Sequence, residues 1–328
     1  MDLSNAVRGS IFFPRFLPSF SRLGYCSRRW LWDAELPDFA GQEWVVTGAS
    51  SGIGRAIALR AAGAGARVHV VARSEARLAA LTNEVPEYLR AWPADLSSMA
   101  SVSALAEGLA AELKKVDVLV NNVGLMLQQR EETPDGLEKS FATNLLGHYL
   151  LTEQLREAGA LGDAVVINMS SGGMYNVSLD LDQLQGGRAF DGTFTYAYQK
   201  RAQVALNQWW RERGMNSYVM HPGWVDTPGV QTAMPEFYLA TRPLLRDAEE
   251  GADTAIWLAA KRPEQPSADG IWFDRMLRSA HYLPGTRAGA NGAALVGYLE
   301  GALKAVRDRS EQAVSNTSNS ESMGSSAL

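Results

Sequence analysis

Cysteine is almost absent from this chain, since Cys26 is the single one among 328 residues. That count excludes an intrachain disulfide framework and a cysteine-rich zinc site. The four histidines form no metal-ligand spacing, so we expect no metal. No run of about 18 apolar residues is present either, and we therefore expect no membrane-spanning helix. A chain poor in cysteine fits a reducing compartment, which predicts an intracellular, cytoplasmic location.

A large excess of one charge sign is also lacking, with 31 Lys and Arg against 36 Asp and Glu and a formal net charge of -5. A nucleic-acid-binding domain needs a clustered basic surface that displaces counterions, so we expect no nucleic-acid partner. Hydrophobic residues make up 46% of the chain, which is typical of a globular protein with a sizeable core.

The first 40 residues form a basic, aromatic extension. Its arginines and apolar residues are Arg8, Arg15, Arg22, Arg28, Arg29, Phe12, Phe13, Phe16, Leu17, Phe20 and Leu23. One interpretation is peripheral contact with a membrane surface or targeting to an organelle. The other is a segment packed on the domain, which Pro14 and Pro18 favour because they would break a long helix. The sequence leaves both open.

From Glu43 to about Phe273, within a domain that we expect to span residues 41–300, short apolar runs alternate with longer helical stretches. The expected strands are 43–47, 67–72, 88–92, 116–121, 164–169, 217–221 and 270–273, and the clearest helices are 53–64, 98–114, 134–158 and 196–213. Apolar strands separated by helices predict a single α/β domain, doubly wound and Rossmann-type, with a parallel sheet of about seven strands covered on both faces. Residues 309–328 are rich in Ser and Asn without apolar periodicity, which predicts a disordered tail.

A glycine-rich turn follows the first expected strand directly. Gly48, Gly52 and Gly54 are spaced by four and two residues and lead into an Ala-rich helix. In a nucleotide-binding turn such glycines permit the tight turn, the close approach of a pyrophosphate and close packing of helix on strand. The helix N-terminus then offers free N–H groups to the phosphates. A tight turn without a ligand is the alternative, and the position in the first βαβ unit favours the nucleotide.

The end of the second expected strand bears on the choice between nicotinamide cofactors. An NAD site places a carboxylate there, whereas an arginine can hold the 2′-phosphate of NADP. Arg73 lies at this strand end and Arg55 lies beside the glycine turn, so two guanidinium groups can pair with a phosphate. The alternative is that both arginines are solvated at the surface. Glu75 lies close to the strand end, so an NAD(H) site with a carboxylate is also possible. We favour NADP(H) over NAD(H).

Tyr196 and Lys200 lie four residues apart near the start of an expected helix, so they share one helix face. A nearby ammonium favours the ionised tyrosine and can lower its pKa. Such a pair can donate and accept the proton of a carbonyl and alcohol couple. Tyr198 does not share the face of Lys200, and we therefore expect Tyr196 to be the catalytic tyrosine.

Together with the glycine turn, this pair resembles the short-chain dehydrogenase/reductase family, in the branch with the spacing Gly-x-x-x-Gly-x-Gly. Further matches follow in the family's order: Asp95 and Leu96, Asn121 to Gly124, Asn144, Ser170 and Ser171, and Pro222 and Gly223. The resemblance covers about residues 41–275. It implies an oxidoreductase that interconverts a carbonyl and an alcohol by hydride transfer with a nicotinamide cofactor.

The resemblance also implies roles for individual residues. Ser171 would donate to the substrate oxygen, Asn144 would hold a water that relays protons, and Lys200 would bind the nicotinamide ribose and lower the tyrosine pKa. The cofactor-binding residues would be Gly48, Ser50, Ser51, Gly52, Ile53, Gly54, Arg55, Arg73, Asp95, Leu96, Asn122, Val123, Gly124, Tyr196, Lys200, Pro222, Gly223, Val225 and Thr227. One departure is that Ser171 precedes Tyr196 by 25 residues, farther than in compact members. Val123 also replaces the commoner alanine.

Residues 224–246, which we call the lid, carry apolar side chains such as Met234, Phe237 and Leu245. If they contact the substrate, they predict a small apolar carbonyl or alcohol. The alternative is that these side chains pack under the lid and never touch the substrate. Trp209 and Trp210 lie on the helix of the catalytic pair and belong to the core or to the homodimer face that family members commonly use. Both interpretations can hold together, because adjacent residues face different ways. Two other classes of function stay open: a catalytically silent dinucleotide-binding sensor or scaffold, and a lipid-surface binding protein.

Overall fold

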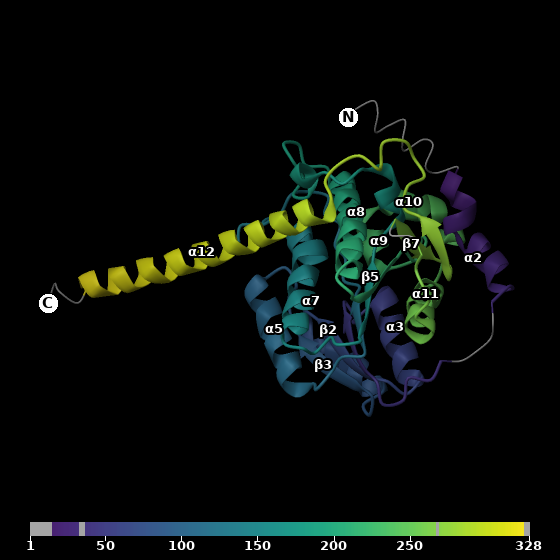
Figure 1. The fold of residues 1–328 in the computed structure, drawn as a ribbon, viewed down its shortest axis with the longest axis horizontal. Helices are drawn as coiled ribbons and strands as arrows, with labels where there is room; N and C mark the ends of the chain where they lie inside the picture. Colours follow the sequence, from purple (N-terminus) through teal and green to yellow (C-terminus); the bar gives the residue numbers. More distant parts are fainter. Residues whose placement is uncertain (1–14, 33–36, 267–268, 325–328) are drawn as a thin grey trace.

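The computed structural model describes residues 15–32, 37–266 and 269–324 (Figure 1). The beginning of the predicted extension, with Arg8, Phe12 and Phe13, lies outside the described residues. Within the described part, no helix combines the length and the apolar character that a membrane span requires.

A single sheet organises the chain, with the strand order β3-β2-β1-β4-β5-β6-β7-β8. Its strands are β1 (Glu43–Thr47), β2 (Arg67–Ala72), β3 (Leu89–Pro93), β4 (Val118–Asn121), β5 (Val165–Met169), β6 (Asn216–Met220), β7 (Gly270–Phe273) and β8 (Met276–Ser279). All neighbouring pairs from β3 to β7 are parallel, which confirms the doubly wound α/β prediction. The direction of strand order reverses between β1 and β4, where such folds bind ligands.

Strand β8 is an addition to the seven predicted strands, and it pairs antiparallel with β7. The turn between them consists of Asp274 and Arg275, which have φ angles of 50° and 59°. Non-glycine residues rarely adopt this left-handed region. Here Asp274 pairs with Arg246 and Arg275 pairs with Asp253, at N–O distances of 2.6 and 2.8 Å. These distant partners stabilise a turn that carries no glycine signal in the sequence.

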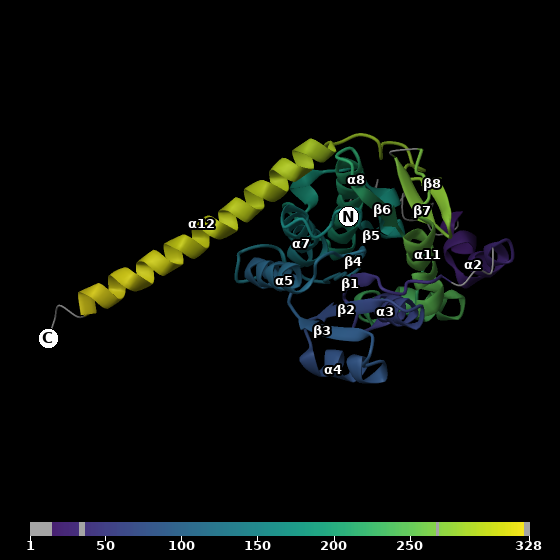
Figure 2. The ribbon, with the colours of Figure 1, turned by 60° about the horizontal axis from the view of Figure 1, so that its bottom comes forward.

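Helices cover both faces of the sheet (Figure 2). One face carries α3 (Gly52–Gly63), α4 (Glu75–Glu84) and α11 (Ala248–Lys261), and the other carries α5 (Met99–Glu112), α7 (Gly147–Glu157) and α8 (Gly192–Arg211). The side chains of β1 alternate between them, since Trp44 and Val46 belong to the first core and Val45 to the second. The buried strands thus read as continuous apolar runs because both faces are covered.

Shorter helical elements complete the fold. They are α6 (Lys139–Phe141), the π-helical turn η1 (Ala142–Leu146), the 3-10 turns η2 (Gly172–Asn176), η3 (Leu181–Gln183) and η4 (Arg242–Leu244), and the lid helices α9 (Pro228–Ala233) and α10 (Pro235–Thr241). The π-helical turn interrupts the predicted helix 134–158 at Asn144. A wider turn of this kind is often found at functional sites.

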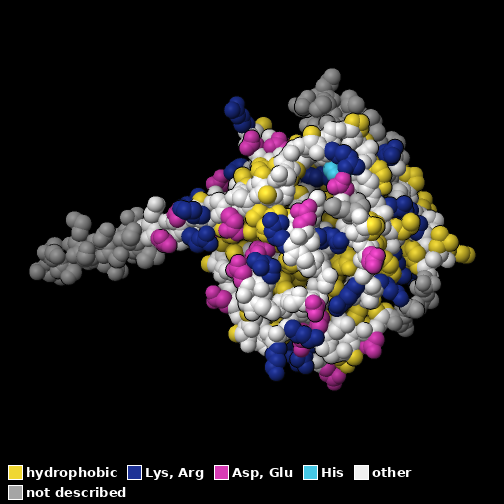
Figure 3. Space-filling view, in the orientation of Figure 1, with side chains coloured by type: hydrophobic (Ala, Val, Ile, Leu, Met, Phe, Trp, Pro, Cys, Tyr) yellow, Lys and Arg dark blue, Asp and Glu magenta, His cyan; other side chains and the backbone are white. Residues whose placement is uncertain are grey.

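The described part of the N-terminal extension packs on the domain. Residues 15–20 are helical, and α2 (Arg22–Arg29) follows. Phe16 and Phe20 are buried in a cluster with Tyr175 and Phe273. The opposite side of this segment exposes Leu23, Trp30 and Leu31. Hydrophobic side chains accordingly protrude at the right edge of the surface in Figure 3, where α2 lies in Figure 1.

The last helix, α12 (Gly292–Gly324), crosses α7 and α8 and then leaves the domain (Figure 1). It buries Leu295, Leu299, Leu303 and Val306, which are spaced by four, four and three residues along one face. Over residues 309–324, where we expected a disordered tail, the backbone continues as helix. The regular apolar spacing ends at Val306, and the side chains described beyond it, at residues 307–312, are exposed.

Candidate active site

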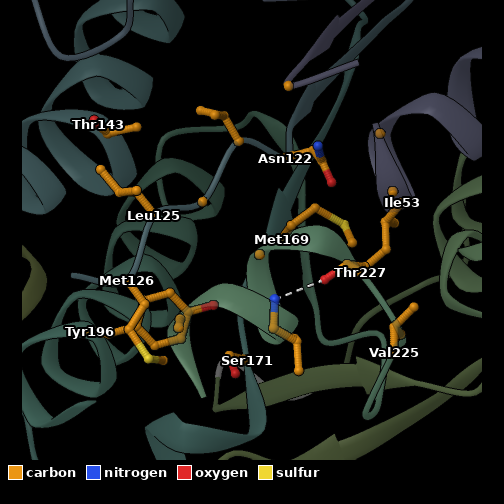
Figure 4. A pocket seen from close by; sticks show the side chains of 18 of the residues that line it. Ile53, Asn122, Leu125, Met126, Thr143, Met169, Ser171, Tyr196, Val225 and Thr227 are labelled. Atoms are coloured by element: carbon orange, nitrogen blue, oxygen red, sulfur yellow. Dashed lines mark hydrogen bonds between the residues drawn. The ribbon is translucent and has the colours of Figure 1, made fainter. Parts of the chain in front are cut away.

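A cavity of about 780 Å³ opens at the carboxyl ends of the central strands. It is lined by residues from the turns after β1, β2, β3, β4, β5 and β6. Every site residue predicted from the sequence lines it except Arg55 and Asn144. Figure 4 shows Tyr196 and Ser171 reaching into the space that Ile53 and Thr227 border. The fold therefore gathers residues that lie far apart in the sequence into one cavity.

The glycine turn is held against the end of β4 by hydrogen bonds. The Thr47 hydroxyl accepts from the backbone N–H groups of Asn122 at 2.9 Å and Val123 at 3.1 Å, and the Asn122 side-chain amide donates to the Thr47 carbonyl at 2.8 Å. A side chain at Gly54 would overlap this amide and the Gly48 carbonyl. Close packing of α3 against the turn thus requires glycine there.

The N-terminus of α3 faces the cavity through Ser51, Gly52, Ile53 and Gly54. The side chain of its N-cap residue, Ser51, makes no capping hydrogen bond. The first N–H groups of a helix lack intrahelical acceptors, so they are available to an anion. This turn, with its close glycine packing, fits the pyrophosphate of a dinucleotide.

Two arginines line the cavity at the end of β2: Arg73, as predicted, and Arg77. Arg77 lies in the first turn of α4, and its N–H donates to the N-cap hydroxyl of Ser74 at 3.3 Å. Arg55 instead pairs with Glu84 at 2.6 Å, outside the cavity lining. Arg77 was not among the predicted site residues, although its position four residues after Arg73, across the start of a helix, could have indicated it.

Helix α8 carries the proposed catalytic pair into the cavity. Its N-terminus is capped by Asp191, which accepts from the N–H groups of Thr193 at 3.0 Å and Phe194 at 3.1 Å. Tyr196 and Lys200 then follow one turn apart, with the lysine Nζ 5.3 Å from the centroid of the tyrosine ring. Ser171, from the turn after β5, hydrogen-bonds the Tyr196 side chain. A serine, a tyrosine and a lysine therefore line the same cavity, with the serine in hydrogen-bond contact with the tyrosine.

Burial governs the protonation of both α8 residues. Burial raises the pKa of Tyr196 to about 12, and it outweighs the hydrogen bond with Ser171, which lowers that pKa. It also lowers the pKa of Lys200 to about 7. Lys200 Nζ donates to the Met169 carbonyl at 2.8 Å. We expected the Lys200 ammonium to lower the pKa of Tyr196. Instead, burial lowers the pKa of the lysine and raises that of the tyrosine, so Tyr196 keeps its proton at neutral pH.

Lys200 predicts a specific dependence of stability on pH. Its pKa is about 7 in the folded protein and near 10.5 when unfolded, so the unfolded state binds the extra proton between these values and stability rises with pH across this window. Lys200→Met removes this dependence. We expect the variant to gain most in free energy of unfolding over the wild type below pH 7, by up to about 4 kcal/mol, and the gain to shrink toward pH 10.

Thermal unfolding of the cofactor-free protein at pH 6 and pH 9.5 measures the effect. Lys304→Met is the matched control, because Lys304 is exposed and pairs with Asp308 on the surface of α12. Parallel pH curves for Lys200→Met and the wild type would contradict the buried, depressed lysine.

Asn144 lies beneath the cavity, where its side chain holds the loop after β4. Its amide donates to the Leu125 carbonyl and to Gln199 Oε1, both at 2.7 Å, and its oxygen accepts from the Leu125 N–H at 2.7 Å. Its backbone carbonyl accepts from Gln203 Nε2 at 2.8 Å and contacts His148 Nδ1 at 3.1 Å. Asn144 therefore fixes Leu125, which lines the cavity.

His148 is buried and neutral, because burial and nearby Lys200 lower its pKa to about 3. Its Nε2 lies 3.3 Å from the hydroxyl of Thr47, next to the glycine turn. Gln199 donates in turn to the Ser140 hydroxyl at 2.9 Å and to Glu138 at 3.2 Å. No local sequence pattern predicts this amide network, because its members come from separate segments of the chain.

Comparisons with known proteins identify the family of the chain. The family model described as short chain dehydrogenase matches residues 42–179. Dehydrogenase/reductase SDR family member 12 from Bos taurus is 37% identical over 297 residues, covering 87% of this chain and 93% of the relative. Retinol dehydrogenase 12 from Homo sapiens is 31% identical over 246 residues, covering 71% and 78%. The chain belongs to the short-chain dehydrogenase/reductase family.

Solved structures show the same fold with a nucleotide bound. A blue fluorescent protein from a metagenomic library, in complex with NADPH, is 26% identical, covers 69% of this chain and 93% of its own, and has a TM-score of 0.56. The RhlG/NADP active-site complex from Pseudomonas aeruginosa is also 26% identical, with a TM-score of 0.55 and coverages of 68% and 91%. The present protein is an NAD(P)-binding oxidoreductase acting on CH–OH or C=O groups.

Proposed function

We propose that this enzyme uses NADP(H) and interconverts a carbonyl and an alcohol on a neutral, apolar small molecule. The observation that carries the proposal is a single cavity lined at once by Arg73 and Arg77, by the glycine turn, and by Ser171, Tyr196 and Lys200. Two guanidinium groups suit the 2′-phosphate. Glu75, which kept NAD(H) open, does not line the cavity.

The substrate side of the cavity supports an apolar ligand. Its lining there includes Leu125, Met126, Phe194, Trp224, Met234 and Phe237. Trp224 and Phe237 contact each other edge to face, with ring centroids 5.2 Å apart. The charged residues of the described cavity lining are Arg73, Arg77, Asp95 and Lys200, which the proposal assigns to the cofactor and to proton transfer. A ligand with a free carboxylate or ammonium would therefore lose hydration against the apolar residues without an ionic partner of its own.

In the proposed reaction Tyr196, Ser171 and Lys200 have separate roles. When bound, NADPH supplies the hydride. Tyr196, protonated at neutral pH, donates its hydroxyl proton to the carbonyl oxygen, and Ser171 orients that oxygen and stabilises the charge that develops on it. Lys200, with a pKa of about 7, can take and return a proton beside the tyrosine at working pH. Alcohol oxidation uses the same groups in reverse.

The direct test is a titration of the purified protein with NADPH and with NADH, followed by nicotinamide fluorescence. We expect NADPH to bind at least about tenfold more tightly, because only its 2′-phosphate reaches the arginines. A panel of apolar aldehydes and ketones, with carboxylated analogues as controls, then identifies turnover. Binding of neither nucleotide would contradict the proposal, and preference for carboxylated substrates would overturn its apolar part.

A further inference from the structure

The N-terminal segment (residues 15–32) packs directly behind the active site, and Phe20 is one of its buried residues. Phe20 is 3% exposed. Its ring lies edge to face with Trp224 and Phe273, at centroid distances of 5.9 and 5.2 Å, and 4.4 Å from the ring of His221. Phe16 stacks on it at 4.6 Å. The segment thus inserts an aromatic plug between the sheet and the beginning of the lid.

One contact of this plug reaches the turn that bears the catalytic serine. A Cβ at Gly172 would lie 2.6 Å from the Phe20 ring, so ring and backbone are in direct contact there. Gly172 follows Ser171, whose hydroxyl meets Tyr196. Any shift of the ring would therefore change the space behind the serine turn.

A second contact reaches the base of the lid. The Phe20 carbonyl accepts the backbone N–H of Trp224 at 3.0 Å and the Arg246 Nε–H at 3.0 Å. Trp224 and Arg246 are the first and last residues of the lid, and the Arg246 N–H donates to the Trp224 carbonyl at 2.8 Å. A single carbonyl of the N-terminal segment thus holds both ends of the lid.

Ion pairs fix this arrangement. Arg246 is 1% exposed and pairs with Asp274 at 2.6 Å, while it also donates to the carbonyls of Ser19 and Pro222, each at 3.1 Å. Arg28 from α2 donates to the same Asp274 at 2.7 Å. The buried carboxylate therefore joins α2, the β7–β8 turn and the lid.

We propose that the N-terminal segment is a positioning element of the active site, with Phe20 setting the serine turn and the base of the lid. This inference goes beyond the proposed function and rests on it only for the activity readout. A segment that only covered the hydrophobic core would make its contacts at a distance from the catalytic side chains. Here the contacts converge on Gly172 and Trp224, which directly adjoin or line the cavity.

Phe20→Ala is the principal test, with Phe20→Leu as the conservative variant and Leu23→Ala as the matched control, because Leu23 is 66% exposed on the outer side of the same segment. We expect Phe20→Ala to lower kcat/KM for an apolar carbonyl about ten- to hundredfold, since small displacements of catalytic groups are costly. NADPH affinity should change by less than about threefold. Phe20→Leu should recover most of the activity, and Leu23→Ala should leave it unchanged.

Hydrogen exchange supplies a readout that needs no substrate. In Phe20→Ala we expect faster amide exchange in residues 170–176 and 222–246, with unchanged exchange in β1 and β4. Arg28→Met, which removes one partner of Asp274, should reproduce the change more weakly, whereas Arg29→Met at the neighbouring exposed position should not. This pair keeps the test informative if Phe20→Ala does not fold.

The outcomes separate the two proposals. Unchanged kcat/KM and exchange in Phe20→Ala would overturn the positioning role, and so would a parallel fall of turnover, NADPH affinity and exchange protection throughout the domain. A wild-type protein that turns over no carbonyl would contradict the proposed function, while the local exchange pattern would still decide the role of Phe20.

Discussion

Tyr196→Phe is expected to abolish turnover, with a loss of at least about a thousandfold in kcat, while NADPH still binds. The change removes only the hydroxyl that hydrogen-bonds Ser171 and leaves the ring that lines the cavity. Without that hydroxyl no side chain at this position can give a proton to the carbonyl oxygen. Stopped-flow hydride transfer and nicotinamide fluorescence, measured on the same preparation, separate chemistry from binding.

Tyr198→Phe provides a close control on the same helix. Tyr198 packs against the core that α12 helps to form and does not line the cavity, so we expect its variant to turn over like the wild type. Retained turnover in Tyr196→Phe would remove the tyrosine from the mechanism. Loss of activity in Tyr198→Phe would place the proton donor two residues away.

Arg73→Asp is expected to weaken NADPH binding about a hundredfold or more and NADH binding only slightly. Under the proposed assignment of Arg73 to the 2′-phosphate, the substitution removes a charge-assisted contact worth about 1.5 to 3 kcal/mol and adds a repelling carboxylate. Arg77→Asp should act in the same direction, because Arg77 lines the same part of the cavity. Parallel fluorescence titrations with the two nucleotides measure the ratio directly.

Arg55→Ala distinguishes the two arginine assignments. The sequence placed Arg55 beside the phosphate, but in the structure it pairs with Glu84 outside the cavity lining. We therefore expect Arg55→Ala to leave the ratio of NADPH to NADH affinity nearly unchanged. Equal weakening of both nucleotides by Arg73→Asp would contradict the 2′-phosphate assignment.

The parts of the fold that sequence reasoning predicted are those encoded locally. Buried parallel strands appear in the sequence as continuous apolar runs, and the glycine turn is recognised from the spacing of its glycines alone. Strand β8 was missed because its turn, Asp274 and Arg275, depends on Arg246 and Asp253 from other elements. A left-handed turn without glycine leaves no local pattern.

The candidate site shows the same division. Tyr196 and Lys200 were predicted because both lie on one helix, and Ser171 was added through the resemblance, since 25 residues separate it from the tyrosine. The second arginine of the cavity, Arg77, and the amide network around Asn144 were missed. Each depends on how separate elements meet, and a single sequence does not show that.

The path of α12 bears on how copies of this enzyme can associate. Before it leaves the domain, the helix lies on α8, where a Cβ at Gly292 would be 3.0 Å from Cβ of Trp209, and the Glu300 side chain accepts from the Tyr149 hydroxyl of α7 at 2.7 Å. Trp210, on the same part of α8, is buried. The part of α8 that carries Trp209 is thus covered by a helix of the same chain. Self-association through this face of α8 would first have to displace α12.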